Sequence, residues 1–158
     1  MPAEVHCWKT RRVYADIEAE DTAAASLRFP NGALGAIEAC TAAWPGWQRP
    51  VEICGENGSA MLEDDHLSHW DFREAQAGDE AIRGAKVDDA MRSGAGAPNA
   101  ITYHGHLRQI QDLIDSLLED RPVAIDGHEA SKAVALIRAL YASAESGAPV
   151  PLAAKWLA

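Results

Sequence analysis

Cysteine, positive charge and long apolar runs are all scarce in this chain of 158 residues. The three cysteines are widely spaced and form no C-x-x-C pair, which excludes a disulfide framework or a zinc ribbon and indicates a reducing, cytoplasmic compartment. Lysine and arginine number 14 against 24 acidic residues, which gives a formal net charge of −10. Nucleic acids and anionic membranes attract proteins with excess positive charge. We therefore expect neither as a partner.

Signals for a membrane, for secretion or for common catalytic sites are also missing. No apolar run approaches the roughly 18 residues of a membrane span, and residues 1–6 lack the basic and apolar parts of a secretion signal. The sequence contains no G-x-G-x-x-G after a strand, no P-loop, no G-x-S-x-G and no H-E-x-x-H. We expect no catalytic residue, cofactor site or metal site in this chain.

The first half of the sequence has the alternation and turns of an antiparallel sheet. Strands are predicted at residues 5–14, 21–29, 33–41, 50–55, 59–62 and 66–72. Asn31-Gly32 and Asn57-Gly58 are predicted as tight hairpin turns, because both residue types tolerate a positive φ. Consecutive strands joined by short turns pair antiparallel. We therefore predict one antiparallel sheet of about five or six strands within residues 4–72.

The second half is predicted to be helical, with two long helices within residues 102–146. Apolar residues recur every three or four positions in the first helix, which ends at Arg121-Pro122. The second begins after Asp126, a candidate N-cap with Glu129 three residues on, and Gly147 is placed to end it. Residues 74–100 are rich in alanine and glycine, and we predict a long loop there with a helical turn near residues 79–83. The whole chain, residues 1–158, is predicted to be a single domain of the α+β class.

Two helices cannot cover both faces of the predicted sheet. With both helices on one face, the result is an open-faced, mainly antiparallel sheet. Several strands nevertheless carry apolar side chains on both faces, among them Leu27, Leu34, Ile37 and Val51. A bare face of this composition is more often an association surface than a solvated one. We therefore expect a homo-oligomer formed through the open sheet face.

Three polar clusters are candidates for binding. The loop of residues 44–49 places indoles, an amide and a guanidinium at a strand end, which suits a small sugar or polyol; its members are Trp44, Trp47, Gln48 and Arg49. The alternative is that both tryptophans pack down as loop anchors. His104 and His106 open the first helix, where a histidine either binds a polar ligand, transfers a proton or is solvated. His66 and His69 are expected on opposite sides of a strand, which argues against a shared metal.

Several short motifs occur in a fixed order along the chain. They are EDTA at residues 20–23, LRFPNGALGAIEA at 27–39, VEICGENGSA at 51–60, QIQDL at 109–113, RPV at 121–123 and DGHEA at 126–130. In this order they resemble the C-terminal domain of the Gfo/Idh/MocA family, the glucose–fructose oxidoreductases and inositol dehydrogenases, over residues 4–152. The resemblance implies a substrate-binding and oligomerisation domain with the fold of the glyceraldehyde-3-phosphate dehydrogenase C-terminal domain. In complete members a Rossmann domain precedes it and binds NAD or NADP, and hydride passes between the nicotinamide and a sugar, inositol or related polyol.

The resemblance also implies parts that this sequence does not contain. The family's glycine-rich nucleotide loop, its Glu-Lys-Pro segment and its Asp-x-x-x-His helix, with the catalytic lysine and histidine, would precede residue 1. Residues 44–49 correspond to a loop that contacts substrate in relatives, which often carry tyrosines where Trp44 and Trp47 stand. His106 falls where many relatives have a tyrosine near the substrate.

Three interpretations of this pattern stay open. The favoured one is the C-terminal part of an NAD(P)-dependent oxidoreductase, which cannot transfer hydride alone. The second is a free-standing module that binds a sugar. The third is a non-catalytic interaction subunit that pairs with a Rossmann-bearing chain.

Overall fold

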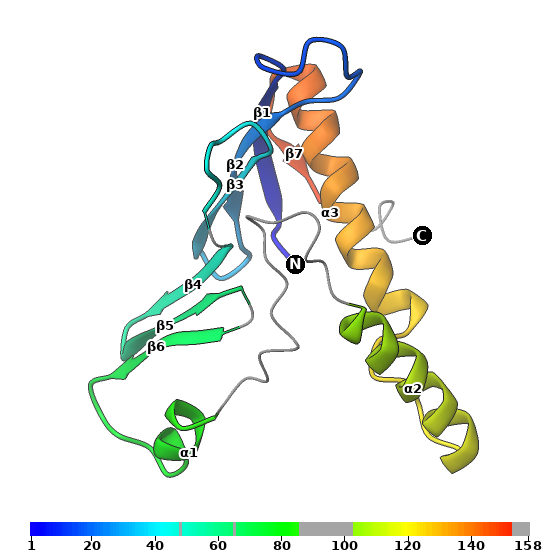
Figure 1. Ribbon diagram of the computed structural model, residues 1–158. Helices are drawn as coiled ribbons and strands as arrows, with labels where there is room; N and C mark the ends of the chain where they lie inside the picture. Colours follow the sequence, from blue (N-terminus) through cyan, green and yellow to red (C-terminus); the bar gives the residue numbers. More distant parts are fainter. Residues whose placement is uncertain (48, 65, 86–102, 153–158) are drawn as a thin grey trace. The chain divides into compact units, whose positions relative to one another are not determined.

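The computed structural model describes residues 1–47, 49–64, 66–85 and 103–152. The chain divides into two compact units, one of Met1–Trp44 with Ser116–Ala158 and one of Pro45–Asp115 (Figure 1). The described strands form antiparallel sheets accompanied by helices, so the predicted α+β class is confirmed. The prediction of one sheet was wrong, because the strands belong to two separate sheets.

A four-stranded sheet in the order β3-β2-β1-β7 forms the centre of the first unit. Its strands are β1 (Glu4–Thr10), β2 (Thr22–Arg28), β3 (Leu34–Cys40) and the two-residue β7 (Val150–Pro151), which the sequence did not predict. The β2–β3 hairpin turns at Gly32, whose φ of 87° confirms the predicted positive-φ turn. Val5 lies opposite Leu27, and Leu27 lies opposite Gly35, so three strands contribute to one face.

Helix α3 (Gly127–Ser146) covers that face by packing against β1 and β7 (Figure 1). Its predicted ends are confirmed: Asp126 accepts the Glu129 N–H at 2.7 Å, and Gly147 ends the helix with a φ of 68°. Small side chains on the packed face let the helix approach the strands closely; they are Ala135, Ala139 and Ser143, all buried. The Ser143 hydroxyl accepts the buried Cys7 N–H at 3.0 Å and donates to the Ala148 carbonyl at 2.7 Å. One side chain thus joins α3 to β1 and to the segment that leads into β7.

A three-stranded sheet in the order β4-β5-β6 and a short helix belong to the second unit. Their bounds are β4 (Pro50–Gly55), β5 (Gly58–Glu63), β6 (His66–Phe72) and α1 (Asp79–Arg83), the last confirming the predicted helical turn. The β5–β6 register shifts between Met61 and Leu62, so that His66 pairs with Glu63 and His69 with Met61. The prediction that these histidines face opposite sides was therefore wrong, because the irregularity absorbs one residue of β6.

Helix α2 (His104–Glu119) begins in the second unit and ends in the first. Its predicted apolar stripe is present but exposed in the described part of the chain, with exposed fractions from 45% at Ile114 to 80% at Leu118. Of the two predicted long helices, α3 is therefore the one that the described contacts show packed on a sheet.

Candidate functional site

The end of β1 is shaped by one buried carboxylate. The sequence predicted a strand to residue 14, but β1 stops at Thr10 because the next residues turn around Asp21. Asp21, 3% exposed, accepts the backbone N–H groups of Arg12, Val13 and Tyr14 at 2.8, 2.7 and 3.2 Å. These donors, with that of Val13 first, hold the pKa of Asp21 at about 2 against the opposing effect of burial. The backbone of residues 12–14 is therefore fixed beside the start of β2.

The same loop is joined to the end of β3. The Tyr14 hydroxyl donates to the Thr41 carbonyl at 3.2 Å, and the Thr41 N–H donates to the Asp21 carbonyl at 2.9 Å. Since antiparallel pairing brings the end of β1, the start of β2 and the end of β3 to one edge of the sheet, residues 11–21 and 41–44 meet there. This edge is the candidate site of the first unit.

Charges of both signs lie at this edge, because the cations of residues 9–12 are followed by Asp16, Glu18, Glu20 and Asp21. Lys9, Arg11 and Arg12 lie within four consecutive residues. A shallow cavity of about 260 Å³ is lined by Lys9, Thr10, Arg11, Glu18, Ala19 and Glu20. The sequence analysis missed these residues, although the run of three cations in four positions was visible as a signal.

The predicted loop of residues 44–49 exposes its aromatic side chains. Trp44 is 92% exposed and Trp47 is 80% exposed, so neither packs down in the described part of the chain. Arg49 is held by Asp64, whose Oδ1 accepts the Arg49 backbone N–H at 3.0 Å and its Nε at 3.2 Å. Gln48 lies outside the described residues. Contact of this loop with a substrate stays a prediction.

The predicted histidines lie in the first turn of α2. The rings of His104 and Tyr103 stack with centroids 4.6 Å apart, while His106 is exposed. Trp44 belongs to the first unit, whereas Trp47, Arg49, His104 and His106 belong to the second. Their role in binding stays a prediction.

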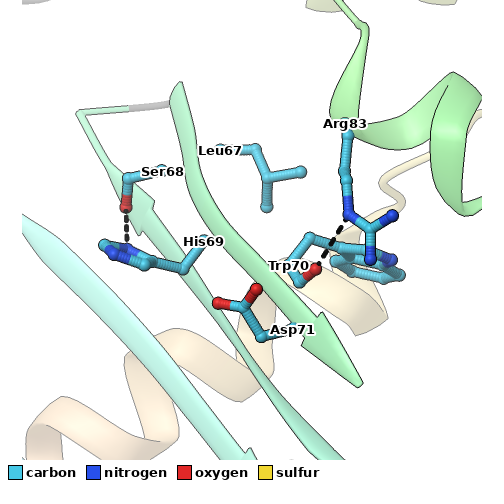
Figure 2. A pocket seen from close by; sticks show the side chains of 6 residues that line it. All are labelled: Leu67, Ser68, His69, Trp70, Asp71 and Arg83. Atoms are coloured by element: carbon cyan, nitrogen blue, oxygen red, sulfur yellow. Dashed lines mark hydrogen bonds between the residues drawn. The ribbon is translucent and has the colours of Figure 1, made fainter. Parts of the chain in front are cut away.

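A second cavity, of about 300 Å³, lies between β6 and α1 (Figure 2). Figure 2 shows the lining side chains of Leu67, Ser68, His69, Trp70, Asp71 and Arg83. Asp79, 4% exposed, accepts the Gln76 N–H at 2.6 Å and the Trp70 indole N–H at 3.0 Å, and these donors, with that of Gln76 first, lower the pKa of its carboxyl group. Arg83 donates through Nε to the Trp70 carbonyl at 3.2 Å and pairs with Glu80 at 3.0 Å. These contacts attach α1 to β6.

Metal and membrane sites were searched for in the described residues. Within residues 1–47, 49–64, 66–85 and 103–152, no group of three or more histidine, cysteine or acidic side chains could hold a metal ion. In the same ranges, no helix has the length and apolar character needed to span a bilayer.

Comparison with known sequences identifies the family. The sequence model described as "Oxidoreductase family, C-terminal alpha/beta domain", that of the Gfo/Idh/MocA proteins, matches residues 2–152. The chain belongs to this family. The resemblance carried by the ordered motifs is thereby confirmed. Among curated proteins, none has a sequence that matches the chain.

Solved structures of oxidoreductases share the fold. The WlbA dehydrogenase from Bordetella pertussis, in complex with NADH and UDP-GlcNAcA, is 27% identical to this chain with a TM-score of 0.74. The match covers 96% of this chain and 40% of the WlbA chain. WlbA from Chromobacterium violaceum, with the same two ligands, is 25% identical at the same TM-score and coverage. An oxidoreductase from Agrobacterium radiobacter, in complex with NAD⁺, L-tartaric acid and magnesium, is 22% identical with a TM-score of 0.69. The match covers 98% of this chain and 44% of that one. At this level of identity, the likeness shows the fold alone. The chain thus spans about two fifths of the length of these neighbours.

Proposed function

We propose that this chain is the substrate-binding and oligomerisation part of an NAD(P)-dependent oxidoreductase that acts on a sugar, inositol or related polyol. The family match over residues 2–152 supports the class of enzyme. The neighbour from Bordetella pertussis, which holds NADH and UDP-GlcNAcA, supports a nicotinamide cofactor and a sugar-type substrate. Because the chain spans 40% of that neighbour, we assign hydride transfer to the complete enzyme and not to this chain alone.

The described residues do not fit a dinucleotide. A Rossmann-type site needs parallel strands joined by a helix whose N-terminus receives the pyrophosphate. Every strand pair within the described ranges is antiparallel. We therefore place NAD(P) on another domain or on a partner chain, and derive no step of hydride transfer from these residues.

The exposure of the two indoles in residues 44–49 is the observation that carries the substrate-binding role. Trp44 and Trp47 keep 92% and 80% of their surface in water. A flat apolar ring stacks on the C–H face of a sugar, while nearby polar groups bind its hydroxyls. Arg49, oriented by Asp64, supplies donors in the same loop. His106, exposed in the first turn of α2, supplies a further hydrogen-bonding group.

Binding of a small sugar to the labelled chain tests this role. We expect neutral hexoses or inositol to shift the indole N–H signals of Trp44 and Trp47 in NMR titrations, and NADH to shift none. Trp44→Ala should raise the dissociation constant about tenfold, which equals about 1.4 kcal/mol. Ile53→Ala, which truncates a 69%-exposed side chain on β4, should not. Failure of every sugar and polyol to bind would contradict the proposal.

The oligomerisation role is proposed for the face of the four-stranded sheet opposite α3. Trp8 and Leu34 lie on that face, 58% and 80% exposed, and the rings of Trp8 and His6 are 4.1 Å apart. Sedimentation velocity should show a dimer or larger species for the wild type and a monomer for Leu34→Lys. Ile53→Lys should keep the wild-type state. A monomeric wild-type chain is the result that excludes association through this face.

The proposal also places the protein in the cytoplasm. Cys7, Cys40 and Cys54 are all unpaired, which agrees with a reducing compartment.

A further inference from the structure

Charges of both signs line the cavity at the end of β1. The end of the strand and the residue after it contribute Lys9 and Arg11, and the segment that leads back to β2 contributes Glu18 and Glu20. Two cations and two carboxylates give this lining a formal charge of zero. A neutral lining does not attract anions over cations. It places N–H donors beside carboxylate acceptors, which are the two kinds of group that bind a hydroxyl.

Three of these side chains are held in place by other parts of the first unit. Arg11 donates through Nη1 to the Ile17 carbonyl at 2.7 Å, which fixes its guanidinium across the loop. Glu20 accepts the Tyr141 hydroxyl of α3. Lys9 lies over the Tyr141 ring, 4.4 Å from its centroid. The lining is therefore oriented before a ligand arrives, which lowers the entropic cost of binding.

The lining keeps hydrogen-bonding capacity that the described contacts do not use. A guanidinium has five N–H donors, and the Ile17 carbonyl occupies one side of that of Arg11. Glu18 is exposed, and no hydrogen bond or ion pair joins its carboxylate to another described residue. Hydrogen bonds between a charged group and a hydroxyl are stronger than those between neutral groups. Arg11 and Glu18 are therefore the main donor and the main acceptor that the cavity offers to a ligand.

We propose that this cavity binds the hydroxyls of an uncharged sugar or polyol. Arg11 donates to one hydroxyl and Glu18 accepts from a neighbouring one. An ionised sugar gains no overall attraction from a neutral lining to offset the loss of its hydration, and like charges in the lining oppose it. The volume of about 260 Å³ lies just under the roughly 300–1,000 Å³ usual for small-molecule sites, so it fits one sugar ring. The inference rests on the proposed function, because Thr41 at the same edge of the sheet lies three residues before Trp44.

Titration with neutral and ionised sugars tests the inference. The probes are glucose, myo-inositol, glucuronate and protonated glucosamine, added to the labelled 158-residue chain and followed by NMR. We expect at least one neutral probe to shift the signals of residues 9–11 and 18–20. It should bind about fivefold more tightly than either ionised probe. Arg11→Gln and Glu18→Gln should each weaken the binding of that neutral probe about fivefold.

The same two substitutions should change selectivity in opposite directions. Glu18→Gln leaves two cations and one carboxylate in the lining, so it should remove most of the penalty against glucuronate. Arg11→Gln leaves one cation and two carboxylates, so it should do the same for glucosamine. A purely structural role would not produce this opposite pair of changes. Arg28→Gln and Glu56→Gln serve as controls with the same changes in net charge, because Arg28 pairs with Glu4 at the opposite end of β2 and Glu56 is exposed in the second unit.

The outcomes separate this inference from the proposed function. Neutral binding that both substitutions leave unchanged overturns the inference and leaves the proposed function standing, because the sugar then binds elsewhere. An ionised probe that binds the wild type as tightly as the neutral probes also overturns the inference. Binding of no probe at all counts against the proposed function itself, and the inference fails with it.

Discussion

Replacing Gly58 with alanine should break the pairing of β5 and β6 and lower the free energy of unfolding by about 3 kcal/mol. A Cβ atom at residue 58 would lie 2.4 Å from the Asp71 carbonyl oxygen and 2.5 Å from Cδ1 of Phe72. Contact with a backbone oxygen cannot be relieved by a rotamer change, so the strands must move apart. Amide hydrogen exchange of residues 66–72, followed with urea denaturation, measures both effects.

Gly55→Ala is the matched control for this prediction. Gly55 lies opposite Gly58 in the same hairpin, and its added Cβ would be 3.5 Å from the Gly58 carbonyl, an ordinary contact. Its stability and exchange rates should stay close to those of the wild type. Equal effects of the two substitutions would show that loss of glycine flexibility, and not the close approach of β6, is what matters.

The two Asn-Gly pairs show how far local sequence rules reach. At Asn31-Gly32 the rule was correct in both place and cause, since Gly32 has a φ of 87°. At Asn57-Gly58 a turn was predicted and is present, but neither residue has a positive φ. Glycine is required at residue 58 because β6 passes close to it. Steric contact with a strand 13 residues further along cannot be read from a dipeptide.

The wrong strand end and the wrong sheet count have related causes. Residues 5–14 contain no helix breaker and read as one strand, yet a carboxylate at residue 21 captures the backbone at residues 12–14. Such a side-chain contact leaves no periodic signal. The division into two sheets depends on which strands pair across residues 41–49, and alternation within each strand carries no information about that choice.

The candidate site could also be predicted only in part, because contacts between distant segments leave no signal in the local sequence. Composition alone singled out the indoles of residues 44–49, and both are exposed. The cations of residues 9–12 were overlooked because about 30 residues of sequence separate them from the end of β3. Only the antiparallel register of β1, β2 and β3 brings residues 9–12 and the end of β3 to one edge. The fold, and not a motif, therefore defines this site.

Replacing Asp21 with asparagine should destabilise the chain at neutral pH and remove part of its sensitivity to acid. The three N–H groups of residues 12–14 all donate to Oδ2, and the Thr22 hydroxyl donates to Oδ1. An amide oxygen carries no charge and binds these N–H groups more weakly, and the amide has no second acceptor for Thr22. The pKa of Asp21 is about 2 in the folded chain, below the ordinary 3.8. A lowered pKa stabilises the fold above pH 3.8, and this contribution is lost as the pH falls from there toward 2.

The difference in stability between the wild type and Asp21→Asn should therefore be constant from pH 7 to pH 5 and shrink between about pH 4 and pH 2. Urea denaturation at each pH measures it, and taking the difference cancels the titration of the other carboxylates. Asp16→Asn, at an exposed position of the same loop, should unfold like the wild type at pH 7. In Asp21→Asn the signals of Arg12 and Tyr14 should broaden even where the chain stays folded, because the loop has lost its anchor. A pH-independent difference would show that Asp21 acts through its shape alone, and sharp signals would show that the Tyr14–Thr41 hydrogen bond suffices to hold the loop.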